Sequence, residues 1–425
     1  MRVFNLNPYL HLLCAGLILG GVAQPRHLTA QTSSLHPTTE WQLQPSLKYD
    51  ALCLLNALSG DAFYLRYYQA EYDHFYPLLT REEKAAFVQL KHVIKDEGRG
   101  IISARLALYY SAVDDETLPQ MIRTAHDSLT MKAALQKTSY WNGDSWQNYE
   151  AARPALEVAL KALDRVGFPA YWEANARPRI EKRIAELSPD LKKYNVIPVI
   201  EGYLGFPLPS QTIKVYLLAY SEPHGIRITG LRFLTHVSYP FTIVLHNAIH
   251  ESMHPPYRKD DASVRQAIDL LGKDPTVIDK VQHHDASFGY NTTASYIEED
   301  SVEALEQIVS EKFGVGSSPC QYWREHDDGM HVLAAAIYVG YKQAVSESPQ
   351  PYSQWFVHAV ETGQLRGSNL QGTVRSFFAV TTCYRAWITT ASSGLLVVFT
   401  ALAFLRIRRR QHARARLAAF PGRSI

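Results

Sequence analysis

Cysteine is scarce in this sequence, which has only 4 cysteines in 425 residues. So few cysteines in so long a chain exclude a small domain held together by a disulfide framework. The sequence also lacks a CxxC pair, a GxSxG nucleophile elbow and a GxGxxG turn, the motifs of thiol-redox, serine-hydrolase and dinucleotide-binding proteins. Neither sign of charge is in excess, because 43 basic and 41 acidic residues nearly cancel.

The basic residues are unevenly distributed along the chain. Residues 386–425 hold seven arginines and no acid, so the body before them is net acidic. A domain that grips phosphate backbones needs a basic surface, and nucleic-acid binding is therefore disfavoured. With 46% hydrophobic and 20% charged residues, the chain has a normal globular composition.

The N-terminal residues predict export. Residues 1–23 carry a single charge, Arg2, followed by an apolar stretch that ends in small residues. This arrangement is typical of a secretory signal peptide, and an uncleaved N-terminal anchor is the alternative. An exported body would permit a disulfide between Cys53 and Cys320, the two cysteines that lie well inside it.

The C-terminal residues predict a membrane anchor. Residues 386–405 form an uncharged apolar run, and the arginine-rich residues 406–425 follow it. A run of this length is sufficient for a helix to cross a bilayer core of about 30 Å. Positive flanks stay in the cytoplasm, so the pattern predicts a single-pass protein whose body lies outside, in the periplasm or the extracellular space. Membrane lipid is the expected partner of this segment, and a buried core helix is the alternative.

Between the two ends the sequence predicts an α+β fold. Residues 24–46 are rich in Ser, Thr, Gln and Pro and suggest a linker. Residues 47–190 show helical periodicity, whereas residues 191–380 predict a small mixed β-sheet followed by further helices. The expected strands are short, β-branched and aromatic, and lie at residues 196–200, 213–220, 225–230 and 231–237.

The clearest chemical motif is an HExxH pattern at residues 250–254. On a helix His250 and His254 lie one turn apart on the same face and can bind one metal ion, while Glu251 is rotated by about 100° toward a water on that metal. Chance would produce the pattern about 0.035 times in a chain of this composition. Pro255-Pro256 follows directly, which is consistent with a helix that ends at the second histidine. The motif predicts a site for one zinc ion.

A catalytic zinc usually takes three protein ligands, and a downstream segment offers carboxylates. Ser295 and Glu298 fit a capping box that would open a helix there. On that helix Glu299, Glu303 and Glu306 form an acidic row beside an apolar seam. Such a row can face a metal ion that is held on a neighbouring helix.

Other choices for the third ligand stay open. The stretch His283-His284-Asp285 lies between the two helices and offers an aspzincin-like or a three-histidine arrangement. His246 continues the histidine row of the first helix at i and i+4 spacing, and is a further candidate. The same row also fits a solvated histidine stripe, but such a stripe does not require Glu251.

The HExxH pattern followed by a glutamate on a later helix resembles the gluzincin, or thermolysin-like, zinc metallopeptidases over about residues 210–312. The resemblance implies that residues 191–380 form a zincin-like region. It also implies that His250, His254 and Glu299 bind one Zn²⁺ ion, that Glu251 is the general base, and that Glu303 supports the first histidine. The interval of 45 residues between His254 and Glu299 is longer than in thermolysin itself.

The resemblance also implies the function, which is hydrolysis of peptide bonds in a peptide or protein substrate by a zinc-bound water that Glu251 activates. Tyr290, His284 and Tyr257 are candidates for stabilising the developing oxyanion. The strand at 231–237 is expected to form the edge that aligns the substrate by main-chain pairing. A membrane-anchored metal-binding or sensing module without catalytic activity is the alternative.

Overall fold

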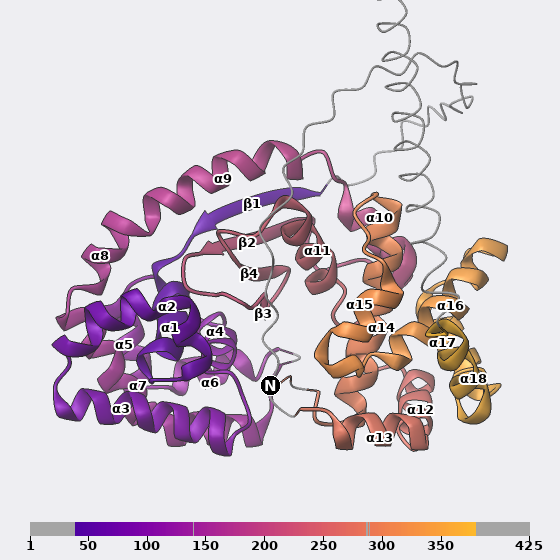
Figure 1. Ribbon diagram of the computed structural model, residues 1–425, viewed down its shortest axis with the longest axis horizontal. Helices are drawn as coiled ribbons and strands as arrows, with labels where there is room; N and C mark the ends of the chain where they lie inside the picture. The colour runs from indigo at the N-terminus through magenta and orange to yellow at the C-terminus, as the bar shows by residue number, and fades with distance from the viewer. Residues whose placement is uncertain (1–38, 139, 286–287, 289, 380–425) are drawn as a thin grey trace, which may run out of the picture. The chain divides into compact units, whose positions relative to one another are not determined.

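The computed structural model describes residues 39–138, 140–285, 288 and 290–379 (Figure 1). Helices make up most of this part of the chain, which confirms a mainly helical α+β fold. The helices before strand β2 are α1 (Leu47–Leu58), α2 (Ala62–Phe75), η1 (Tyr76–Leu78), α3 (Arg81–Lys91), the π-helix η2 (His92–Glu97), α4 (Ile102–Tyr110), α5 (Leu118–His126), α6 (Leu129–Leu135), α7 (Gly143–Arg165), α8 (Phe168–Asn175), α9 (Arg177–Leu191) and α10 (Val196–Leu204). Those after strand β4 are α11 (Phe241–Ser252), α12 (Ala262–Leu271), α13 (Pro275–His283), α14 (Thr293–Lys312), α15 (Pro319–Glu325), η4 (Asp327–Gly329), α16 (Val332–Glu347), α17 (Tyr352–Glu361) and α18 (Gly367–Phe377).

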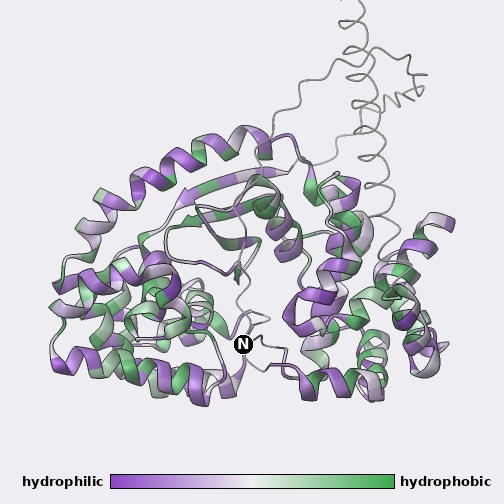
Figure 2. Cartoon of the chain, viewed as in Figure 1, coloured by the Kyte–Doolittle hydropathy of each residue, from purple (hydrophilic) through white to green (hydrophobic). Residues whose placement is uncertain are grey.

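The membrane-related predictions fall on other parts of the chain. The signal peptide at residues 1–23, the transmembrane segment at 386–405 and the basic tail at 406–425 lie outside the described residues. In the part that is described, none of the helices combines the length and the apolarity that crossing a bilayer requires. Most of these helices carry hydrophilic and hydrophobic residues side by side (Figure 2), as helices with one face on a core do.

A mixed sheet of four strands has the order β1-β2-β4-β3. Its strands are β1 (Glu40–Pro45), β2 (Thr212–Leu218), β3 (Ile226–Ile228) and β4 (Arg232–His236). β1 and β4 both pair with β2 in parallel, and β3 pairs with β4 in the antiparallel direction. The strands predicted at 213–220, 225–230 and 231–237 are thereby confirmed. β4 lies inside the sheet, however, so the prediction that it forms the substrate edge is wrong, and β3 is the edge strand on that side.

Two segments differ from the sequence prediction. Residues 40–45, predicted as the end of a linker, form β1, and the Trp41 indole nitrogen donates to the carbonyl of Tyr194 at 3.0 Å. The polar composition of the segment hides a strand whose Trp41 side chain is buried. Residues 196–200, predicted as a strand, open helix α10, because a short apolar run fits a buried helix as well as a strand. Helix α10 ends at Gly205, whose φ of +77° favours glycine.

Helices α11 and α14 are the elements that carry the predicted chemistry. One side of α11 is apolar and buried, and the helix contacts β2 and β4 of the sheet as well as α9. α14 contacts α10, α11, α12, α13 and α16, and every residue from Glu299 to Ser310 is buried. The polar side chains of α14 in this stretch must therefore find partners within the protein.

A buried aspartate joins the first helix to the sheet. Asp50 of α1 is fully buried and accepts hydrogen bonds from the backbone nitrogens of Ala219 at 2.8 Å and Tyr220 at 3.0 Å, directly after β2. Its second oxygen accepts from the indole nitrogen of Trp172 in α8 at 2.7 Å. One carboxylate thus connects two helices to the end of a sheet strand.

We expect the Asp50→Ala substitution to lower the free energy of unfolding by about 3 kcal/mol, because it leaves three buried donors without an acceptor. Chemical denaturation would measure the change. Asp73→Ala, at an exposed position of α2, is the matched control and should change the same free energy by less than about 0.5 kcal/mol. An equal effect of the two substitutions would contradict the assigned role of Asp50.

Candidate metal centre

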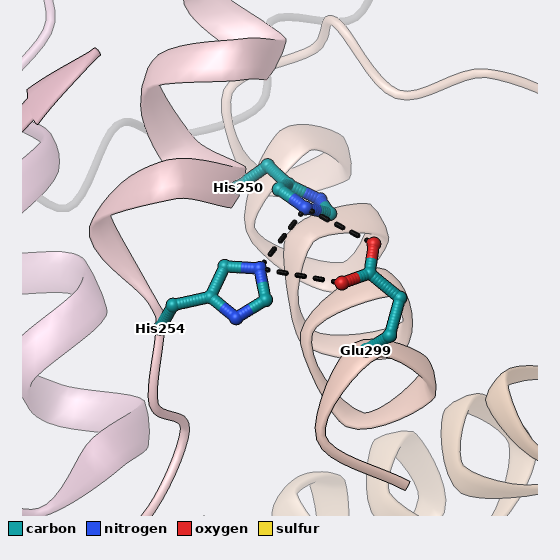
Figure 3. A group of neighbouring side chains, drawn as sticks. All are labelled: His250, His254 and Glu299. Carbon is teal, nitrogen blue, oxygen red and sulfur yellow. Dashed lines mark hydrogen bonds and ion pairs between the residues drawn. The ribbon is translucent and has the colours of Figure 1, made fainter. Parts of the chain in front are cut away.

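The two motif histidines and one glutamate converge on a single point. The Nε2 atoms of His250 and His254 lie 3.2 Å apart. The Glu299 carboxylate lies 3.4 Å from the first of these nitrogens and 3.5 Å from the second. In Figure 3 the three side chains point toward one another, His250 and Glu299 from two helices and His254 from the segment that follows the first of them. Among the described residues, they are the group whose ligand atoms could hold a metal ion.

These separations have the size that tetrahedral coordination requires. Ligand atoms held about 2.0–2.1 Å from a central ion in a tetrahedron are about 3.3–3.4 Å from one another. The three distances in the site, 3.2, 3.4 and 3.5 Å, are close to that value. The first distance joins the two imidazole nitrogens, and each of the other two joins one nitrogen to a different oxygen of the Glu299 carboxylate, so the two nitrogens and the carboxylate group face one point.

The helix that presents the motif is shorter than expected. α11 ends at Ser252 with Met253 as its C-cap, so His254 lies just beyond the helix rather than inside it. The residue before a proline is disfavoured in the α conformation, and Pro255 follows His254 directly. The prediction that both histidines are helical is therefore wrong for His254, although the two imidazoles still face the same point.

The far nitrogens of both histidines also face carboxylates. The Nδ1 atom of His254 lies 3.4 Å from Glu298, and Nδ1 of His250 lies 3.9 Å from Glu303. The other oxygen of Glu303 accepts from the indole nitrogen of Trp323 at 2.9 Å. Carboxylates in these positions fix the orientation and the tautomer of a metal-binding imidazole. The structure thus places Glu303 beside the first histidine, where the resemblance expects it.

Helix α14 begins earlier than predicted, which gives Glu298 a different position. Its capping box is formed by Thr292 and Ser295, so the prediction of a box made by Ser295 and Glu298 is wrong. Glu298 instead pairs with Lys259 at 2.7 Å, in addition to facing His254. Both candidate caps are hydroxyl residues, and the sequence alone does not say which of them opens the helix.

The histidine row of α11 and the acidic row of α14 pair along their length. His246, one turn before His250, forms an ion pair with Glu306 at 2.8 Å. The two helices thus run in opposite directions where they pair. His246 faces Glu306, and His250, one turn later, faces Glu303 and Glu299. His246 donates from Nδ1 to the Glu306 carboxylate and is not part of the group that could hold a metal.

The charges in the site are mutually stabilised. Burial alone would favour the neutral imidazole, but the nearby Glu299 carboxylate outweighs burial and raises the pKa of His250 to about 10. Burial likewise opposes ionisation of Glu299, but His250, His331 and a hydrogen bond from Tyr290 prevail and lower its pKa. A metal ion that binds here would have to displace a proton from His250.

Glu251 differs from the other acids of the site. It forms no hydrogen bond or ion pair with any residue in the described part of the chain, and it is partly buried. Burial raises its pKa, and the Glu299 carboxylate adds to this effect against the opposing charges of His250 and Arg227. A carboxylate with a raised pKa and no internal partner is suited to exchange protons with a bound ligand.

The sequence prediction missed a second buried network beneath the site. His331 is 2% exposed and contacts Asp300 at 2.7 Å through Nδ1 and Asp327 at 3.2 Å through Nε2. Burial opposes its protonation, but the two carboxylates raise the pKa of His331 well above its ordinary value. The four-residue spacing of Asp327 and His331 was the feature of the sequence that could have indicated their contact. No helical pattern connects His331 with Asp300 in the sequence.

Arg227 on the edge strand β3 also reaches the site. Its guanidinium donates a hydrogen bond to the carbonyl of His254 and lies 5.0 Å from the ring centre of Tyr140. The contact connects the edge strand to the segment that carries the second histidine. No motif in the sequence indicates this role, because it depends on the order of the strands.

The alternative ligands and two of the oxyanion candidates lie elsewhere. His283 is exposed at the end of α13 and pairs with Asp279 at 3.0 Å, while Nδ1 of His284 faces the carbonyls of Lys280 and Val281. Neither they nor Asp285 belongs to the group that could hold a metal.

Tyr257 is 1% exposed and stacks on Phe356 in the core, so it is not free to act on a substrate. Of the three tyrosine and histidine candidates, Tyr290 is the one in contact with a site residue, Glu299.

The two inner cysteines do not form a disulfide with each other. Cys53 is a free thiol in α1 and is completely buried. Burial raises its pKa well above the ordinary value, which keeps the thiol protonated and unreactive. The bond between Cys53 and Cys320 that an exported body would permit is therefore absent.

No family model, curated protein or solved structure matches the chain. The chemistry of the site thus rests on its own donor atoms and their geometry. Those donors, two imidazoles and a carboxylate, form a buried group that is suited to a divalent transition metal.

We expect His250→Ala and Glu299→Ala to abolish stoichiometric metal binding, because each removes one of three converging ligands. His283→Ala should leave binding unchanged, since His283 lies outside the group. Metal analysis of the purified variants after dialysis against zinc would measure the outcome. Loss of metal in His283→Ala with retention in Glu299→Ala would show that the third ligand has been assigned wrongly.

Proposed function

We propose that this protein is a zinc metallopeptidase of the gluzincin type that hydrolyses peptide bonds outside the cytoplasm. The observation that carries the proposal is the convergence of His250, His254 and Glu299 beside Glu251, a carboxylate without an internal partner. The geometry supports a metal site, and the HExxH spacing supports its use in hydrolysis. Zinc is the proposed ion because two imidazoles and one carboxylate are the donor set of many catalytic zinc sites.

The residues of the chain have distinct roles in the proposed reaction. A zinc ion at this site would supply a Lewis acid that polarises the substrate carbonyl and makes a nearby water more acidic. Glu251 would accept a proton from the attacking water and then deliver it to the leaving amine. Its raised pKa suits both steps, because the carboxylate must hold the proton between them. Tyr290 is the proposed donor to the oxyanion, for which its hydroxyl would move from Glu299 to the substrate.

The proposed substrate lies along the edge strand β3. Its outer side has no partner strand among the described residues, and helix α4 contacts it, so the peptide would pair with backbone groups that α4 leaves uncovered. Arg227 of β3 holds the carbonyl of His254, which couples the position of the edge strand to the metal ligand. Main-chain pairing with β3 would therefore place the scissile bond at a fixed distance from the site.

The proposed location rests on the ends of the sequence. An apolar N-terminal segment and the uncharged run at 386–405 with its arginine-rich flank support export and a single-pass membrane anchor. The net acidic body would then lie in the periplasm or the extracellular space, with membrane lipid and a peptide or protein substrate as its partners. The arginines of residues 406–425 would remain in the cytoplasm.

We expect Glu251→Gln to lower kcat for peptide hydrolysis by about 10³-fold, because it removes the general base and keeps the metal ligands. Bound zinc should remain stoichiometric. A panel of quenched fluorescent peptides would measure turnover, with Glu82→Gln, at an exposed position of α3, as the matched control. Stoichiometric metal without turnover that depends on Glu251 would instead favour a metal-binding or sensing module. A chain that binds no metal at all would contradict both functions.

We expect external protease to digest the body of the full-length protein in intact membranes and to leave a tag on its C-terminus intact. Deletion of residues 386–425 should release the body into the soluble exported fraction. Immunoblotting with antibodies against the body and the tag would show both results, and a cytoplasmic marker serves as the control for membrane integrity. Digestion of the tag with protection of the body would reverse the proposed orientation.

A further inference from the structure

A cleft of about 870 Å³ lies next to the metal centre. Its walls come from helix α2, from the π-helix η2 and the turn after it, from the loop that precedes the edge strand β3, and from the segments that carry Tyr290 and Asp327. The residues that matter for its chemistry are Phe63, Tyr64, Lys95, Arg99, Gly225 and Tyr290. The helical N-terminal half of the chain thus forms one wall, and the region of the metal site forms the other.

Two contacts connect this cleft to the proposed catalytic groups. Tyr290, which lines the cleft, donates a hydrogen bond to the metal-site residue Glu299. Gly225 lies so close to α11 that an added Cβ would be 3.0 Å from the side-chain nitrogen of Asn247. Asn247 precedes Glu251 by four residues and lies on the same face of the helix. A peptide that pairs with β3 would therefore continue into the cleft within a few residues of the proposed scissile bond.

Aromatic side chains form the apolar part of the wall. The ring of Phe63 stacks on His224 with 6.1 Å between ring centres, and Phe63 is 37% exposed. The Tyr64 hydroxyl holds the Nε2 atom of His224 at 2.9 Å. Burial lowers the pKa of His224 to about 4, so this imidazole is neutral and adds no charge to the wall. An apolar side chain of a substrate would pack against this surface.

The two positively charged side chains of the cleft differ in whether the protein supplies them with a partner. Lys95 pairs with Asp61, Asp96 faces His92 at 4.0 Å, and Asp327 contacts His331. Arg99 is exposed and has no ion pair or hydrogen bond with any side chain that the structure describes. Its guanidinium is therefore the positive charge in the cleft that remains available for a ligand, since Lys95 is paired with Asp61.

The backbone of Arg99 is held in an unusual conformation. Its φ is +48°, in the left-handed region that favours glycine, although glycines stand at both neighbouring positions. A π-helix, η2, ends two residues before it. Left-handed non-glycine residues and π-helices both cost stability and are concentrated at functional sites. The unpaired guanidinium of Arg99 thus stands on a strained backbone position at the wall of the cleft.

We propose that Arg99 binds a carboxylate of the peptide substrate, so that the protein prefers peptides with an acidic group a few residues from the scissile bond. This inference rests on the proposed peptidase function and adds a substrate class to it. The carboxylate can belong to an Asp or Glu side chain or to the free C-terminus of the peptide. A guanidinium recognises both, because its paired N–H groups match the two oxygens of a carboxylate.

The test compares peptides that differ only in that carboxylate. One quenched fluorescent peptide is made with Glu or Gln at successive positions on each side of the scissile bond, and with a free or an amidated C-terminus. The zinc-loaded full-length protein should show kcat/KM about fivefold to tenfold higher for the carboxylate form at one position. A preference that disappears with Glu→Gln identifies a side-chain carboxylate, and one that disappears with amidation identifies the C-terminus.

Substitutions of Arg99 then assign the preference to this residue. Arg99→Gly removes the charge and suits the positive φ, so the melting temperature should not fall while the preference drops to within about twofold. Arg99→Glu should reverse the preference toward a Lys peptide. Lys273→Glu makes the same change of charge at an exposed position outside the cleft and should behave like the unchanged protein. An equal preference in the unchanged protein, Arg99→Gly and Arg99→Glu would overturn the proposal.

A binding measurement separates this inference from the proposed function. Fluorescence anisotropy of the labelled peptides with the EDTA-treated full-length protein reports affinity without hydrolysis. Binding that depends on Arg99, in a protein that cleaves none of the peptides, would support the cleft and count against the peptidase. Hydrolysis that depends on Glu251 but not on Arg99, together with equal affinity for both peptide forms, would overturn the carboxylate preference alone.

Discussion

The pairing of buried acids on α14 with imidazoles from two other segments is the interaction on which the site depends. Glu299, Asp300, Glu303 and Glu306 are all buried within eight residues of one helix. Several unpaired carboxylates in such a place would repel one another and lose their hydration. Histidines of α11 and His331 supply the compensating donors and charges. These ion pairs fix the register of α11 against α14. In that register, two histidines and Glu299 lie around one point.

The HExxH motif and the candidate third ligand were predictable because they follow helical periodicity. The spacing of His250 and His254, and the acidic row that begins at Glu299, place side chains on one face of each segment before any tertiary contact is known. The choice between Glu299 and the His283 cluster was not decided by spacing. It depends on how α13 and α14 pack, and those contacts are not encoded in either local pattern.

The fold, like the site, was predictable where local periodicity decides it and not where packing between distant segments does. Composition and periodicity identify the helical regions and three of the strands, but they do not determine the order of strands in the sheet. The position of β4 inside the sheet, with β3 at its edge, follows from pairings between segments that are separated by turns. Arg227 and His331 escaped prediction for the same reason, because each acts through a partner that is distant in the sequence or unrelated to its local pattern.

The first strand has a consequence for the synthesis of the protein. Glu40 of β1 pairs with Thr212 of β2, and their side chains hydrogen-bond across an interval of 172 residues. β1 leaves the ribosome long before its partner exists, so its backbone groups stay unpaired while all the helices from α1 to α10 are made. Closing so long a loop is slow, and an open strand is exposed to wrong pairings in the meantime. The sheet that α11 packs against therefore cannot be completed until β4 has been synthesised, well after β1 and the first ten α-helices.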